Sequence, residues 1–415
     1  HDAADAEAGS VVGADPDSLA RFSRMRDESL PTVVLENFVD GARPIEGFDF
    51  PAACNVIAGH ENRGVSREWL DRADHVVFVP QYGTISSMNV VSSSGIALFH
   101  HHLAQRRRER TEAAAGGGVE KELVLEAKPI PALEDYFDAF RKALPKNADG
   151  ERLDKRPIHP ALYALEHEQI IEAHRRHRSL VLTGSDNGIT YGGELPFHLA
   201  VLYENRVDTR NLGGLVRNAN SYLCPVYYVG KRRINKQGTV GSDHYTELVH
   251  LPTADLTARE RHKLALSQTH QHHVLDPEGD YRHVVRELVE RRRMEVWELS
   301  LDQEQLWEDD GSNDNNSFSD AIQEGLARPK PTVALDVEDG ALLQEIEAAR
   351  DRAPGGIALL VPQEGMRPNA GLRAACTRRV RVVGAPDGLV AGHRGLPSQV
   401  GASIALHRLF LVLLH

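Results

Sequence analysis

Apolar residues occur along this chain in short runs that end in glycine-containing turns. In the first hundred residues these runs predict strands at 55–58 and 75–79, and the small residues from Ser92 to Gly95 lie in a predicted helix. Further along, the pattern predicts strands at 198–203, 225–229 and 294–299, with a helix at 212–222. Strands that alternate with helices form mostly parallel sheets covered on both faces. The predicted fold class is therefore α/β with a parallel sheet.

Two parts of the chain repeat one another. The segment from Pro31 to Glu36 is echoed at 331–336, and Gly95 to His100 is echoed at 403–407. Between these landmarks each copy has an apolar strand, an acidic turn, a further strand and a closing helix; in the second copy the strands are at 356–361 and 380–383. Ordered matches of this kind indicate two copies of one α/β half-domain.

Polar stretches divide the chain. Residues 103–125 lack apolar periodicity and are typical of a linker. We assign 1–110 to a first domain, 111–150 to the linker between the domains and 151–415 to a second domain. The second domain is predicted to begin with a helix at 161–174 and a strand at 179–182. We expect an insertion at about 253–330, which is helical, charged and exposed up to residue 293 and disordered at the acidic tract 308–320.

The composition is that of a globular protein, with 41% apolar and 26% charged residues. The apolar C-terminal stretch is short and is interrupted by His407 and Arg408, which predicts a buried packing helix and no membrane partner. The cysteines are too scattered for a disulfide framework or a zinc ribbon, and they favour a reducing, intracellular compartment, with a mitochondrial location left open: Cys54, Cys224 and Cys376. The chain starts at His1, so we expect further sequence upstream.

Histidine clusters and basic clusters are the remaining candidate sites. Neither His100–His102 nor the group at 270–273 has a carboxylate or cysteine at ligand spacing, so no metal is predicted. The net charge of −12 does not favour nucleic acid, but local patches matter more than the total. Runs at 106–110 and 291–293 are typical of solvated helix ends. The best candidate for RNA contact follows a predicted strand: Lys231, Arg232, Arg233 and Lys236.

Two loops carry the clearest chemical signal. The first strand ends in a glycine turn with one carboxylate, and the second strand ends in a proline, a turn glycine and a helix of small residues. Adjacent loops at the carboxyl ends of parallel strands are the usual ligand site of an α/β sheet. The candidate binding residues are Ala58, Gly59, His60, Glu61, Gly64, Val79, Pro80, Gly83, Ser87, Met88 and Asn89.

Together the two loops resemble the second and third motifs of the SpoU/TrmH branch of the SPOUT RNA methyltransferases. The match rests on Gly59, Glu61, Gly64, Pro80, Gly83, Ser87, Asn89 and Val90, and the chain departs from the motifs at His60, Asn62, Gln81 and Ser86. The resemblance implies that these loops bind S-adenosylmethionine, with Glu61 organising the first loop and Ser87 and Asn89 ordering the second. Loss of a motif carboxylate at Ser86 weakens the expected ordering of the site.

The family's first motif is matched out of order, at Asn211 and Arg217. Six residues of helix advance about 600°, which puts both side chains on nearly one face. The resemblance implies that Arg217 approaches the target ribose and that Asn211 helps to engage RNA. Because arginine stays charged, electrostatic activation of the 2′-hydroxyl is the safer interpretation. An ordinary surface arginine at a helix start is the alternative.

The second copy of the cofactor half is degraded. Pro362 stands where the family has its first glycine, Glu364 is retained and Gln399 replaces the motif asparagine. Proline lacks the N–H that a backbone-binding loop uses. We therefore expect S-adenosylmethionine to bind only in the first copy, and Arg217 of the second domain to complete that site in a tandem pseudo-dimer.

The resemblance further implies a C-terminal trefoil knot, an exception to ordinary chain threading. It implies methyl transfer from S-adenosylmethionine to a ribose 2′-hydroxyl of structured rRNA or tRNA. The alternative is a non-catalytic RNA-binding scaffold in ribosome assembly, including mitochondrial assembly, with assembly intermediates and another SPOUT protein as partners.

Overall fold

The computed structural model describes residues 27–37, 39–60, 64–83, 88–114, 190–191, 195–205, 209–231, 234, 236–251, 281–301, 320–363, 368–382 and 396–414. They fall into two compact units. The smaller unit contains the described residues up to 80 and residues 97–114, and the larger unit contains residues 81–96 and the described residues from 190 onward. The predicted elements at 161–174 and 179–182, the histidines at 270–273 and the acidic tract at 308–319 lie outside the described residues.

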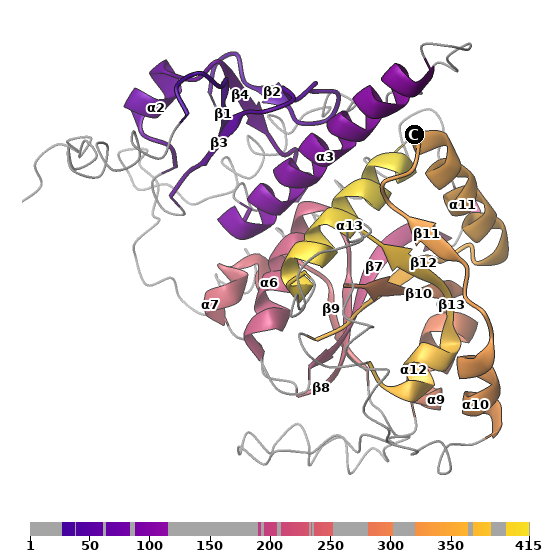
Figure 1. The fold of residues 1–415 in the computed structure, drawn as a ribbon. Helices are drawn as coiled ribbons and strands as arrows, with labels where there is room; N and C mark the ends of the chain where they lie inside the picture. The colour runs from indigo at the N-terminus through magenta and orange to yellow at the C-terminus, as the bar shows by residue number, and fades with distance from the viewer. Residues whose placement is uncertain are drawn as a thin grey trace, which may run out of the picture. The chain divides into compact units, whose positions relative to one another are not determined.

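The smaller unit is built on a parallel sheet of four strands in the order β2-β4-β1-β3 (Figure 1). Its core includes buried valines of the two central strands, Val33, Val34 and Val77. The strands are β1 (Thr32–Leu35), β2 (Arg43–Pro44), β3 (Asn55–Ala58) and β4 (His75–Phe78), and the short helix α2 (Arg67–Asp71) lies between β3 and β4 in sequence.

The long helix α3 (Val90–Ala114) follows β4, with residues 90–96 in the larger unit and 97–114 in the smaller. The expectation of a linker from residue 103 is therefore wrong as far as Ala114. Leu103 and Ala104 are buried, and Arg108 forms an ion pair with Asp49 at 2.9 Å. These tertiary contacts hold an arginine-rich segment helical although its sequence shows no clear apolar stripe.

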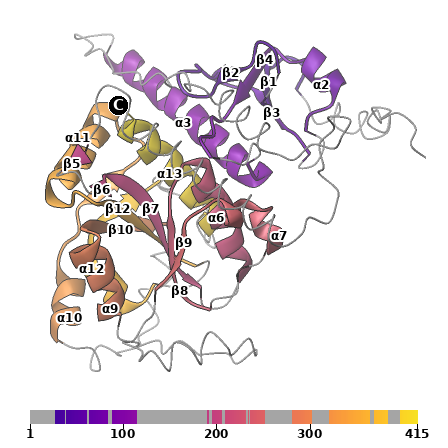
Figure 2. The same cartoon turned by 180° about the vertical axis from the view of Figure 1, so that it is seen from behind.

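The larger unit contains a parallel sheet of seven strands in the order β11-β13-β10-β12-β7-β8-β9. The helices α6, α11 and α13 cover one face, and α9, α10 and α12 cover the other (Figures 1 and 2). The strands are β7 (His198–Asn205), β8 (Val226–Gly230), β9 (Leu248–His250), β10 (Met294–Ser300), β11 (Thr332–Ala334), β12 (Gly356–Val361) and β13 (Cys376–Arg381). A separate antiparallel pair is formed by β5 (Thr190–Tyr191) and β6 (Leu195–Pro196).

The helices of the larger unit are α6 (Thr209–Ser221), α7 (Lys236–Thr239), α9 (Arg282–Val285), α10 (Asp320–Ala327), α11 (Asp339–Arg352), α12 (Ala370–Ala375) and α13 (Ser398–Leu413), with one turn of 3₁₀-helix, η1 (Ser242–His244), and one of π-helix, η2 (Arg286–Arg291). A parallel sheet with helices on both faces confirms the predicted α/β class.

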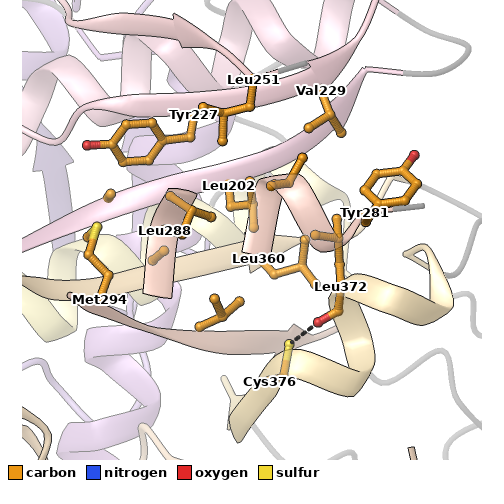
Figure 3. Close-up of a cluster of buried hydrophobic side chains, with 14 residues drawn as sticks. Leu202, Tyr227, Val229, Leu251, Tyr281, Leu288, Met294, Leu360, Leu372 and Cys376 are labelled. Atoms are coloured by element: carbon orange, nitrogen blue, oxygen red, sulfur yellow. Dashed lines mark hydrogen bonds between the residues drawn. The ribbon is translucent and has the colours of Figure 1, made fainter. Parts of the chain in front are cut away.

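One hydrophobic cluster fills the space between the sheet and α9, η2 and α12 (Figure 3). Leu202 and Leu360 project from neighbouring strands towards Leu288 and Leu372. Tyr281, at the start of α9, is part of the same cluster. The expectation of an exposed insertion up to residue 293 is therefore wrong for 281–288, because apolar residues at helical spacing belong to the core and the charges between them face outward.

The order of the four-stranded sheet recurs within the seven-stranded one. In the smaller unit β1 lies between β4 and β3, with β2 beyond β4; in the larger unit β10 lies between β13 and β12, with β11 beyond β13. The sequence repeat matched Pro31–Glu36 with the β11 segment, and this pairing is wrong: by position in the sheet, β1 corresponds to β10. The local sequence misled because both segments begin with Pro-Thr-Val before a buried strand end.

The last helix, α13, is buried along almost its whole length, which confirms a packing helix. Its polar residues are satisfied within the unit: Arg408 pairs with Asp339 and donates to Val337 O at 3.0 Å, and His407 Nδ1 lies 3.1 Å from Tyr222 Oη. Among the described residues, no helix is both long enough and apolar enough to span a membrane.

Candidate functional site

The first candidate loop is a compact turn at the carboxyl end of β3. His60 and Gly64 form an antiparallel bridge, with N–O distances of 3.0 and 2.8 Å. A Cβ on Gly59 would lie 2.7 Å from the carbonyl carbon of Gly64, and Gly64 itself has φ +65°. Both glycines are therefore required by backbone geometry. Glu61 lies outside the described residues.

Glu36 holds the returning limb of this loop. It directly follows β1, and its Oε2 accepts the N–H of Val65 at 2.7 Å while its Oε1 accepts the N–H of Asn37 at 3.1 Å. The same Oε2 would be 2.5 Å from a Cβ on Gly64. A side chain at position 64 would displace the carboxylate, so glycine serves this contact as well as the turn.

The second candidate loop begins in the smaller unit and continues in the larger. Val79 and Pro80 are buried beyond the end of β4. Because β1 lies between β3 and β4, the carboxyl ends of all three strands share one edge of the sheet. The two loops that the sequence singled out therefore leave this edge on either side of Glu36, whereas Ser87 lies outside the described residues.

Within the larger unit, residues 81–83 pack against the end of α6. Tyr82 N donates to Ser221 O at 2.8 Å, and the Tyr82 ring lies 4.9 Å from that of Phe410. Gly83 approaches Asn220 so closely that any Cβ would overlap the Asn220 carbonyl oxygen. The motif glycine is therefore needed for this close approach between the loop and the helix.

Asn89 opens helix α3. Its Oδ1 accepts the N–H of Val91 at 2.8 Å, and its carbonyl accepts the N–H of Ser93 at 2.9 Å, which is the pattern of an N-cap. Met88 beside it is half-buried. The structure thus gives Asn89 a local role in starting the helix, at the end of the second candidate loop.

Arg217 is a buried residue of α6, with 3% of its surface exposed, and this contradicts the alternative of an ordinary surface arginine. It lies one turn before Ser221, whose hydroxyl donates to Arg217 O at 3.3 Å and whose backbone carbonyl binds Tyr82. Asn211, near the start of the same helix, is half-buried. The helix of the first motif and the segment 81–83 are therefore neighbours within one unit.

The basic cluster is only partly visible. Lys231 follows β8 and is half-buried, with its backbone tied to Asn205 through the Lys231 N to Asn205 O bond of 3.0 Å. Lys236 begins α7, whereas Arg232 and Arg233 lie outside the described residues. Within the residues that can be described, no group of three or more histidine, cysteine, aspartate or glutamate side chains is placed to hold a metal ion.

The corresponding loops of the larger unit are closed by their own side chains. Ser398 Oγ donates to the carbonyl of Pro362 at 2.7 Å, and Asn218 Nδ2 donates to Gln399 O at 3.0 Å. The Gln399 amide packs directly on Gly214 of α6, where any Cβ would overlap it. Glu364 lies outside the described residues. The degraded motif thus forms interior packing contacts.

Sequence reasoning missed Glu36, Tyr82 and Asn220. Glu36 carried a usable signal, because a carboxylate directly after a buried strand stands at the edge where ligand loops gather. For Tyr82 and Asn220 the signal was absent, because their contact joins segments that are far apart in sequence.

Comparison with known proteins gives matches among sequence families and solved structures; no curated protein matches. Similar structures include the SpoU methyltransferase AviRb from Streptomyces viridochromogenes (12% identity, TM-score 0.29, covering 52% of this chain and 60% of AviRb). A second is the TrmH/SpoU tRNA modifying enzyme of A. aeolicus (12% identity, TM-score 0.28, covering 58% of this chain and 83% of that enzyme). A third is a probable methyltransferase from Bordetella pertussis Tohama I (12% identity, TM-score 0.30, covering 52% of this chain and 95% of that protein).

The aligned region thus spans less than two thirds of AviRb. In sequence, residues 10–99 match the model of the SpoU rRNA Methylase family, and this segment contains both candidate loops. The resemblance read from those loops is therefore confirmed: over residues 10–99, this chain is similar to the SpoU rRNA methylases.

Proposed function

We propose that this protein is an S-adenosylmethionine-dependent RNA 2′-O-ribose methyltransferase that acts on structured rRNA or tRNA. The proposal includes the C-terminal trefoil knot and the tandem pseudo-dimer that the family resemblance implies. It assigns cofactor binding to the loops around Gly59 and Asn89 and RNA contact to Arg217 and the basic cluster at Lys231.

The observation that carries the proposal is the loop after β3. Its bridge between His60 and Gly64, its two obligatory glycines and its carboxylate support lie at the edge of a parallel sheet where such folds bind ligands. The family match covers the same residues. A loop this closely specified by its backbone is difficult to explain as a simple connection between β3 and α2.

The residues present fit S-adenosylmethionine. The glycines at 59 and 64 let the turn close tightly on itself and on Glu36, so its backbone is held at the sheet edge where α/β folds bind ligands. The bound cofactor would supply an electrophilic methyl group on a sulfonium. The chain's own contribution is then to hold the adenosine part through the loops that leave β3 and β4.

Arg217 would act on the RNA. Because only 3% of its surface is exposed, the proposal requires the target nucleotide to reach a guanidinium that is buried in the described structure. A fixed positive charge beside the ribose stabilises the developing 2′-oxyanion without itself taking a proton. Asn211, half-buried and two turns earlier on α6, would position the flanking backbone.

Two measurements test the proposal. Titration calorimetry with S-adenosylmethionine should give saturable binding at one site per chain. Incubation with tritiated cofactor and total rRNA and tRNA should then transfer label, and alkaline hydrolysis should leave the labelled position as an uncleaved dinucleotide, because a 2′-O-methyl group blocks the attack that cleaves RNA. Label released as a mononucleotide would place the methyl group on a base and contradict ribose specificity.

A non-catalytic RNA-binding scaffold is the second candidate, and the packing of Gln399 on Gly214 favours it, since this half of the fold is built as interior structure. The same two measurements separate the candidates. Retention of RNA with neither cofactor binding nor methyl transfer would support the scaffold in ribosome assembly and overturn the enzyme.

A further inference from the structure

We infer that Glu36 is a positioning residue for the cofactor loop: its carboxylate fixes the limb at Gly64 and Val65, which is bridged to His60, in the form that binds the adenosine part of the cofactor. This inference rests on the proposed function, which it deepens by assigning a residue outside the two motif loops. It concerns the smaller unit alone.

The contacts are specific. Both carboxylate oxygens are engaged, Oε2 by Val65 N at 2.7 Å and Oε1 by Asn37 N at 3.1 Å. Hydrogen bonds from backbone N–H groups to an ionised carboxylate are shorter and stronger than those to neutral acceptors. Glu36 therefore links the end of β1 to the loop of its neighbour β3 through two fixed bonds, and it acts through the loop instead of on a reacting atom.

The loop needs such support because of its glycines. Gly59 and Gly64 give the backbone its tight turn but also give it more freedom to lose on folding. The bridge between His60 and Gly64 closes the turn on itself without attaching it to the sheet. Leu35 pairs with Ala58 in register, so Glu36 stands beside the first loop residue, within reach of the returning limb at Val65.

The degraded half provides an independent observation. Aligning Pro362 with Gly59 aligns Leu360 with Ile57, two residues earlier in each strand. In the sheet, Leu360 is the partner of Glu298 and Ile57 is the partner of Val34. Glu298 and Val34 therefore occupy equivalent positions on the two central strands. Two residues further along each central strand, Glu36 corresponds to Ser300. The second half therefore lacks the supporting carboxylate at the same strand position, beside the loop that has lost its glycine. This joint loss is expected if the carboxylate serves the ligand loop and not the sheet.

The test compares Glu36→Ala and Glu36→Gln with the control Glu68→Ala, which removes an exposed carboxylate from α2 just beyond the loop. Amide exchange at Val65 reports the support, and calorimetry with S-adenosylmethionine reports its consequence. Glu36→Ala should speed exchange at Val65 at least about tenfold and weaken cofactor binding about tenfold or more, because it removes a hydrogen bond from a backbone N–H to a carboxylate.

Glu36→Gln keeps one carbonyl oxygen and should recover most of the affinity, whereas Glu68→Ala should change neither reading. Unchanged exchange at Val65 in Glu36→Ala, or faster exchange with unchanged cofactor affinity, would overturn the inference. If the unaltered protein binds no cofactor, the proposed function fails together with the ligand part of this inference. Exchange at Val65 then still decides whether Glu36 holds the loop.

Discussion

The four-stranded sheet of the smaller unit and the strands β11, β13, β10 and β12 of the larger unit have the same order and the same parallel direction. They differ where the strands end. After β3 the chain makes a glycine turn supported by Glu36, and after β12 it continues through Pro362 into contacts with Ser398. Sheet topology is thus retained in both places, while the loop chemistry is retained in one.

This difference teaches which parts of such a half-domain tolerate changes in sequence. A strand order is maintained by burial of valine, leucine and isoleucine, and it survives changes in the loops. The turn after β3 depends on backbone geometry at a few positions, and a proline cannot replace glycine there. Four experiments can break or sharpen the comparison.

The largest effect is expected from Arg217→Ala, which removes the buried cation of α6. Methyl transfer should fall on the order of a hundredfold or more, as for loss of one oxyanion-stabilising donor, while cofactor affinity stays nearly unchanged. The control is Arg210→Ala, an exposed arginine of the same helix. Single-turnover transfer and calorimetry give the two readings, and equal losses in both would show that Arg217 supports the fold instead.

Exchanging glycine and proline between the halves tests the comparison directly. Gly59→Pro removes an N–H and forces atoms towards the Gly64 carbonyl carbon, 2.7 Å from where a Cβ would stand, so cofactor binding should fall about a hundredfold. Pro362→Gly should leave the single-site stoichiometry unchanged. A second binding site in Pro362→Gly would show that the larger unit retains a functional loop.

Asn89→Ala should have a moderate effect with two parts. Loss of the N-cap oxygen that accepts Val91 N should lower the free energy of unfolding by about 1 kcal/mol in urea titration. If the start of α3 also fixes the second candidate loop, the same loss of about 1 kcal/mol should lower cofactor affinity about fivefold, because about 1.4 kcal/mol corresponds to a tenfold change. Asn89→Ser, which restores a cap, should recover stability, and recovery of affinity with it would identify helix start as the cause.

The last prediction is a pH dependence of stability that differs between the units. Burial, with a contribution from Arg408, lowers the pKa of His407 to about 3, so its contribution to stability is present above pH 6.5 and is lost as pH falls towards 3. Burial raises the pKa of Glu46 to about 8, so its contribution is present below pH 4.5 and is lost as pH rises towards 8.

Urea unfolding between pH 4 and 8 should therefore show the larger unit losing stability as pH falls below 6.5 and the smaller unit losing stability as pH rises from 4.5 to 8. His407→Gln should flatten the acid limb even if it lowers stability overall, because the slope depends on proton uptake alone. An acid limb with the same slope in the variant would assign the effect to other groups.

Much of the architecture could be predicted from the sequence, because it depends on local patterns. Strands β3 and β12 have the predicted bounds, and α6 and the buried α13 lie where apolar periodicity placed them. The error in matching Pro31–Glu36 with the β11 segment has a different origin. Position in a sheet depends on which strands pair, and two buried strands with similar starts cannot be told apart by their own residues.

The candidate site divides in the same way. Gly59, Gly64 and Gly83 were recognisable because tight turns and close backbone approach restrict the residue type. The partners of these glycines were not: Asn220 contacts Gly83 from far along the chain, and the linker expected after residue 103 is a helix because of tertiary contacts such as that of Arg108 with Asp49. Such pairings depend on the whole fold.

The Gln399 amide on Gly214 also bears on how this chain can change in the future. Shortening Gln399 to asparagine would leave a gap of about one methylene and cost about 1 kcal/mol, while Pro362 still blocked the loop. Changing Pro362 first would free a loop that has Ser300, not a carboxylate, beside it. Neither substitution alone would therefore give the loop after β12 both the glycine and the carboxylate that the loop after β3 has.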